Sequence, residues 1–119
     1  MSSINPNFEV RRYSITNTPT LVKSGLTELW GWNIINANAA IAYVQLFDIP
    51  STTAPGFVLG TTIPTRVIVV PTGAGSFSFQ SFLEENHPTF KNGLVIAVTT
   101  TETNSIALGS AISLYLDVE

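Results

Sequence analysis

The feature that most limits how this chain can fold is the spacing of its apolar residues, which recur at every second position in short stretches. In the sequence Ser-Phe-Ser-Phe-Gln at 76–80, Phe77 and Phe79 are separated by polar residues. Successive side chains of a strand point to opposite faces, so we expect these phenylalanines to face a core and the polar residues to face water. The last stretch alternates likewise, with Ile112, Leu114, Leu116 and Val118 on one side and Ala111, Ser113, Tyr115 and Asp117 on the other.

No stretch carries a 3.6-residue apolar period long enough for a helix, and clusters of Gly, Pro, Asn and Thr separate the alternating stretches. The sequence therefore predicts an all-β fold, an antiparallel β-sandwich of the jelly-roll type with about eight strands and little or no helix. The expected strands are 8–15, 20–23, 29–36, 40–48, 64–70, 76–80, 94–99 and 111–118.

The connections between these stretches contain the residues that turns require. Asn92-Gly93 is the dipeptide that best tolerates positive φ in a two-residue hairpin, and 82–86, stopped by Pro88, is expected to form one helical turn. The 119 residues suit one domain. We expect residues 1–7 to form an extended N-terminal arm and 8–119 to form a single sandwich.

Charge and composition exclude several classes of function. The formal net charge is −3 and the pI is near 4.9, so the chain lacks the basic surface that nucleic-acid binding requires. With no cysteine it has neither disulfides nor thiolate metal ligands. No apolar run approaches the roughly 20 residues that span a bilayer, and the N-terminus does not resemble a signal peptide. We expect a protein made in a cytoplasm that contacts neither nucleic acid nor membrane.

Residues that could carry chemistry are few. His87 is the only histidine and follows Glu84 and Glu85, which is too small a set for a metal site, and a solvated loop is the favoured interpretation. A catalytic triad would need His87 with Asp48 or Asp117, and a glycosidase pair would need Glu28 with Asp48. The Gly-Ala-Gly-Ser sequence at 73–76 lacks the lysine and helix of a phosphate-binding loop. We therefore expect no catalytic residues, no metal and no cofactor.

The two tryptophans allow a second interpretation. Trp30 and Trp32, placed on a common face by the alternation, could stack on a sugar if that face were exposed. Because Ile34 continues the same face, a buried core is favoured. A carbohydrate-binding or receptor-binding β-sandwich module of a tail is accordingly the alternative function.

Charge is absent from two long stretches, 39–47 and 106–116. Strands at the edge of a sheet are usually protected by Lys, Pro or inward-pointing charges. If these stretches are edges, a symmetric oligomer or a larger shell should cover them, whereas pairing within the sandwich would protect them equally well.

Five sequence blocks resemble, in order and spacing, small β-sandwich virion proteins of tailed bacteriophages. The blocks are Leu-Trp-Gly-Trp-Asn-Ile-Ile-Asn at 29–36, Ala-Ala-Ile-Ala-Tyr-Val-Gln-Leu-Phe-Asp at 39–48, Gly-Thr-Thr-Ile-Pro-Thr at 60–65, Pro-Thr-Gly-Ala-Gly at 71–75 after an apolar strand at 67–70, and Phe-Lys-Asn-Gly-Leu-Val-Ile-Ala-Val-Thr-Thr-Thr at 90–101. Together they cover about 23–116, so the expected arm lies outside the resemblance.

The resemblance implies a non-enzymatic structural protein of the virion, a decoration or cement protein that binds the assembled head as a homotrimer. Its partner would be the major capsid protein or another virion protein. Aromatic and arginine residues beside the arm and the loops would then be candidates for the subunit or capsid interface. These candidates are Phe8, Arg11, Arg12, Phe57 and Phe90.

Overall fold

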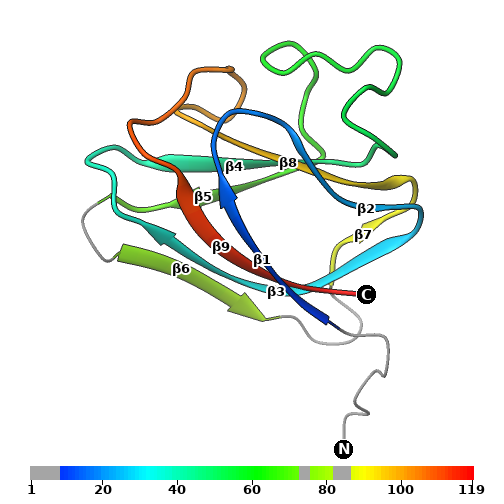
Figure 1. Cartoon of the computed structure of the whole chain (residues 1–119), viewed down its shortest axis with the longest axis horizontal. Helices are drawn as coiled ribbons and strands as arrows, with labels where there is room; N and C mark the ends of the chain where they lie inside the picture. The colour runs from blue at the N-terminus through cyan, green and yellow to red at the C-terminus, as the bar shows by residue number, and fades with distance from the viewer. Residues whose placement is uncertain (1–8, 73–75, 82–86) are drawn as a thin grey trace, which may run out of the picture.

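The chain folds into two antiparallel sheets packed face to face (Figure 1). The computed structural model describes residues 9–72, 76–81 and 87–119, with the side chains of 76–81 excepted. Expectations about the arm, Phe8, the turn at 82–86 and the facing of Phe77 and Phe79 lie outside the described residues and side chains. The strands are β1 (Glu9–Ile15), β2 (Thr20–Ser24), β3 (Thr27–Asn36), β4 (Ala42–Phe47), β5 (Arg66–Val70), β6 (Ser76–Ser81), β7 (Thr89–Phe90), β8 (Gly93–Thr99) and β9 (Ile112–Val118).

The strand order is that of a jelly roll, as predicted. One sheet has the order β1-β9-β3-β6, with β7 also paired to β3, and the other has the order β2-β8-β4-β5. The chain resembles one long hairpin that has been rolled up, because β4 pairs with β5, β3 with β6, β2 with β8 and β1 with β9. Rolling also pairs β9 with β3 and β8 with β4, which completes the two sheets. All eight expected strands are present, and the two-residue β7 is additional.

The core lies between the two sheets. Strand β9 alternates as the sequence predicts, with Ile112, Leu114, Leu116 and Val118 all fully buried. From the opposite sheet, Val44, Leu46, Leu94 and Ile96 belong to the same apolar cluster. Burial of these side chains supplies the main free energy that offsets the loss of chain entropy on folding.

The second sheet is covered on its outer surface by the chain's own loops. Every residue of β8 is buried, and on β4 the outward-facing Gln45 and Phe47 are buried too. Phe57, from the loop between β4 and β5, packs edge-on against Phe47 with ring centroids 4.8 Å apart. The Gln45 side-chain amide donates a hydrogen bond of 2.9 Å to the carbonyl of Asn104 in the loop between β8 and β9. Figure 1 shows both loops, green and orange, on this side of the molecule.

The two uncharged stretches lie in or lead into interior strands. The interpretation that they are uncovered edges is therefore wrong, and the interpretation that they pair within the sandwich is correct. The stretch 39–47 forms β4, between β8 and β5, and 106–116 leads into β9, between β1 and β3. Both are therefore protected by pairing within the sandwich. The four strands at the edges of the two sheets are β1, β6, β2 and β5.

Asn92-Gly93 does not form the expected hairpin, because the chain changes sheets there. Strand β7 pairs with β3, whereas β8 pairs with β2 and β4. Gly93 has φ +146°, and a Cβ atom at this position would lie 2.6 Å from the carbonyl oxygen of Ile49. Glycine is required because the backbone of another segment occupies the space of a side chain. The Asp48 carboxylate fixes the same crossing by accepting hydrogen bonds from the backbone N–H groups of Lys91 and Asn92.

Candidate interaction surface

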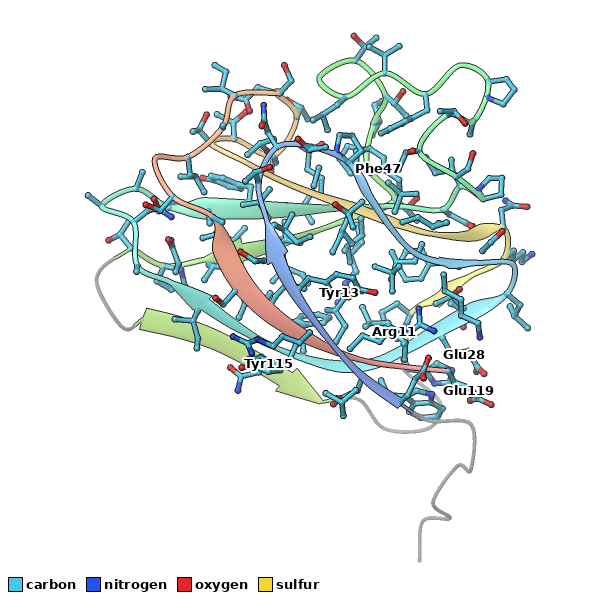
Figure 2. The ribbon with its side chains drawn as sticks, viewed as in Figure 1. Arg11, Tyr13, Glu28, Phe47, Tyr115 and Glu119 are labelled. Atoms are coloured by element: carbon cyan, nitrogen blue, oxygen red, sulfur yellow. The ribbon has the colours of Figure 1, made fainter. Side chains whose placement is uncertain are left out.

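The outer surface of the β1-β9-β3 layer is not covered by the loops that bury the other sheet. Strand register places its side chains in three rows across the layer. We call the described side chains of this surface the open face: Val10, Arg12, Ser14, Asn33, Ile35, Ser113, Tyr115 and Asp117. None of the eight is buried. Figure 2 shows Tyr115 on this side, away from Phe47 beneath the loops of the opposite sheet.

The open face combines two exposed apolar side chains, Val10 and Ile35, with one arginine and one aspartate. Val10 is 61% exposed and Ile35 is 39% exposed. At the centre, the Arg12 guanidinium lies 5.8 Å from the centroid of the Tyr115 ring, a cation–π contact between directly paired residues. Exposed valine and isoleucine beside an arginine and a tyrosine make up the kind of surface that interfaces between proteins use.

Asp117 is the acidic residue of the open face. It pairs with Val10 on one side and with Gly31 on the other. Partial burial raises the pKa of its carboxyl above the ordinary value, because the charged form loses hydration. Covering the open face with a partner would increase this desolvation unless the partner supplied a donor.

His87 is not part of a solvated loop, which corrects the expectation for this residue. Its ring stacks on Trp30 with centroids 3.8 Å apart and an interplanar angle of 22°. Its Nε2 lies 2.6 Å from Oε1 of Glu28, and the His87 side chain is only 12% exposed. The residues that precede it, Glu84 and Glu85, lie outside the described part of the chain.

Neither of the carboxylates that a catalytic triad with His87 would need lies beside this histidine. The carboxylate beside His87 belongs to Glu28 rather than to Asp48 or Asp117. His87 Nδ1 is buried without a hydrogen-bond partner, so no described hydroxyl is placed where this histidine could activate it. Within the described residues, no three His, Asp or Glu side chains gather into a potential metal site. The contacts of His87 with Glu28 and Trp30 join β3 to the segment before β7.

The two tryptophans do not share a face, contrary to the expectation. The register of β3 with β9 shifts between Leu29 and Gly31, so Trp30 is an extra residue in a β-bulge. The bulge reverses the alternation, and Leu29, Trp32 and Ile34 all belong to the core cluster. Trp32 is 6% exposed, which confirms the favoured interpretation for this residue and leaves no sugar-stacking pair.

The structure places the expected interface residues in different environments. Arg12 lies on the open face. Arg11 points inward from β1, where its guanidinium bonds the Glu9 carboxylate and the carbonyl of Val22 in β2, and Glu9 raises its pKa above the ordinary value. Figure 2 shows it between these strands.

The two downstream aromatic candidates are covered to different degrees. Phe57 is half-buried against Phe47. Phe90 is 1% exposed within the core cluster, so its side chain cannot also line a surface.

Sequence reasoning missed Val10, Ile35 and Tyr115 as candidates for an interaction surface. The signal for Tyr115 was present, because it falls on the polar side of the alternation in the last strand. Val10 and Ile35 are apolar, and only their register with Asp117 and Ser113 assigns them to the outer face.

Comparison with known proteins leaves the chain without an assigned family. No protein-family model matches the sequence. No curated protein matches it either. No helix within the described residues is long and apolar enough to cross a bilayer.

Proposed function

We propose that this protein is a non-enzymatic structural component of a bacteriophage virion, a decoration or cement protein that binds the assembled head as a homotrimer. It is made in the cytoplasm of the bacterial host, and its partner is the major capsid protein or another virion protein. The observation that carries the proposal is the difference between the two outer surfaces of the sandwich. One is covered by the chain's own loops over β8 and part of β4, and the other is the open face.

The sequence resemblance supports the proposal independently. Three of its five blocks coincide with strands, since 29–36 lies in β3, 39–48 contains β4 and 90–101 contains β8. The apolar stretch 67–70 between the blocks lies in β5. Fold alone does not specify function, since jelly rolls also serve as lectin and cupin domains. The proposal therefore depends on the open face, whose exposed apolar groups, tyrosine and arginine suit a permanent contact with a flat protein shell.

The mass of the purified protein in solution tests the homotrimer. Light scattering should give three times the 12.8 kDa mass of the chain. A stable monomer over a wide concentration range would contradict the trimer. Repeating the measurement after removing residues 1–7 tests whether the expected arm takes part in assembly.

Two matched substitutions test the contact with the head. Ile35→Lys places a charge on the open face, and Ile63→Lys places it in the loop over the opposite sheet, where Ile63 is 83% exposed. Both sites are exposed, so both variants should fold. The variants would be mixed with heads lacking this protein, from the phage that encodes it, and sedimented. We expect the Ile63→Lys variant to sediment with heads and the Ile35→Lys variant to remain in solution. Equal sedimentation of both would remove the open face as the contact, and failure of the wild type to bind would refute the function.

A further inference from the structure

The sandwich has two lateral edges, where the outermost strands of both sheets lie, and these edges differ in how they are protected from pairing with another chain. On one side lie the edge strands β1 and β2, on the other β5 and β6. Strand β1 carries Glu9, Arg11 and Arg12, and β2 carries Lys23 and a bulge at Val22. Arg11 also joins these two edges through its bond to the carbonyl of Val22. Charges, a bulge and covering contacts are the usual devices that prevent an edge from pairing with another chain.

Strand β5 lacks these devices along most of its length. Its sequence is Arg-Val-Ile-Val-Val, it pairs with β4 in an unbroken register, and none of the other described strands pairs with its opposite edge. Ile68 and Val70 face the core, so Val67 and Val69 face outward, and Val69 is 52% exposed. The single charge, Arg66, lies at the first position, where its guanidinium is 5.7 Å from the Trp32 ring centroid.

Prolines limit the length of this edge. Pro64 precedes β5 by two residues and Pro71 follows it directly. Proline has no N–H to donate to a ladder, so an added strand can pair regularly only with the five residues between them. A partner for this edge must therefore be short, extended and apolar on its outward side.

We propose that β5 of a second copy of this chain is that partner, paired antiparallel about a two-fold axis at Ile68. This register uses all five residues of both strands, which no shifted register does. It sets Val67 opposite Val69 of the other copy, so that the exposed valines cover each other. It sets Arg66 opposite Val70, which keeps the two arginines at opposite ends of the contact. The same pairing at β1 would bring several charged residues of both copies together.

The contact goes beyond the proposed function and does not depend on it. It needs only two copies and uses the edge of the second sheet, whereas the open face belongs to the first sheet. If the protein is a trimer on a head, pairing through β5 would join neighbouring trimers.

Cysteine cross-linking tests the contact and its register, because the wild-type chain has no cysteine. In the proposed register, residues 67 and 69 of two copies lie about 5 Å apart, within reach of a disulfide. Two copies of residue 69 are displaced by two positions, about 6.6 Å along the strands, and lie about 8 Å apart, which is too far. We expect oxidation of a mixture of Val67→Cys and Val69→Cys chains to give a covalent dimer at least fivefold more abundant than with either variant alone.

A mixture of Val58→Cys and Val69→Cys chains provides the collision control, since Val58 is 56% exposed but lies in the loop before β5 and outside the proposed contact. Equal yields from the control and test mixtures would overturn the proposal, as would preferential cross-linking of Val69→Cys with itself. A second measurement avoids cysteine chemistry. In concentration-dependent light scattering, Val69→Lys should abolish a rise in mass with concentration that wild type and Val58→Lys both show. If the mass of the wild type does not rise with concentration, the edge serves a strand of another protein or none, and the proposal is wrong.

Discussion

The strongest stability prediction concerns Asn36, a fully buried amide at the end of β3. Its Nδ2 donates hydrogen bonds to the carbonyls of Ala40, at 2.9 Å, and Pro71, at 3.0 Å. Its Oδ1 accepts bonds from the backbone N–H and the side-chain amide of Asn38, at 2.9 and 3.1 Å. Asn38 in turn exchanges two bonds with the backbone of Ser110. One side chain therefore fixes the ends of three connections, after β3, after β5 and before β9.

Asn36→Ala removes all four of these bonds and leaves their partners in a site with little access to water. A protein hydrogen bond contributes about 0.5–1.5 kcal/mol net, and a buried group left without a partner costs about 1–3 kcal/mol. Partial rescue by a water molecule in the space of the amide would lower the total. We expect a loss of about 3 kcal/mol, a substantial part of the roughly 5–15 kcal/mol that stabilises a domain.

Urea unfolding followed by tryptophan fluorescence measures this loss. With a slope of about 1.5 kcal/mol per molar urea, the midpoint should fall by about 2 M. Asn33→Ala is the matched control, because Asn33 lies on the same strand but is exposed, and it should change stability by less than about 0.5 kcal/mol. All variants must be compared at one protein concentration, since association adds to apparent stability. A loss below about 1 kcal/mol for Asn36→Ala would refute the reasoning that these bonds fix the loops.

Three further predictions follow from single contacts. Gly93→Ala should lower the melting temperature far more than Gly109→Ala. A Cβ atom at position 93 would meet backbone oxygen at 2.6 Å, whereas the nearest atom to one at position 109 is 3.7 Å away; similar losses would contradict the steric argument. Asp117→Asn should raise stability at neutral pH. The pKa of Asp117 is raised on folding, so the folded state binds the proton more tightly and wild-type stability increases as pH falls through that pKa. The difference in unfolding free energy between Asp117→Asn and wild type, measured by urea unfolding from pH 7 to 3, should therefore shrink. A constant difference would contradict this cause. His87→Ala should shift tryptophan emission to longer wavelength, because it removes the ring stacked on Trp30; an unchanged spectrum would show that the stack does not shield the indole.

Much of the fold could be predicted because it depends on local rules. Alternation in the last strand identified its four buried residues, since a strand in a two-layer sandwich has one face toward the core. In the sequence, 40–48, 64–70 and 94–99 are apolar on both faces, which predicts strands that are covered on both sides. For 40–48 and 94–99 this is correct, because β4 and β8 are almost entirely buried. The same argument failed for 64–70, where Val69 is exposed, because only strand order shows that β5 is an edge.

The candidate surface was far less predictable. The alternation through Trp30, Trp32 and Ile34 is regular, yet a bulge at Trp30 reverses it. Gly31 is a residue type that often accompanies a bulge in a strand, but the alternation alone does not show where the register shifts. The bulge arises from the pairing of β3 with β9 and allows Trp30 to stack on His87. The uncharged stretches were similarly ambiguous, since absence of charge suits an interior strand and an uncovered edge equally well.

The sequence by itself determined that this chain forms a β-sandwich, where its strands lie and which class of side chain fills the core, because these properties follow from the period of apolar residues and from turn residues along the chain. Tertiary structure alone decided which strands are edges, which surface the loops cover and which residues surround His87. Those properties depend on pairing between segments far apart in the sequence. A shift of one residue in such pairing moves a side chain from one face of a sheet to the other.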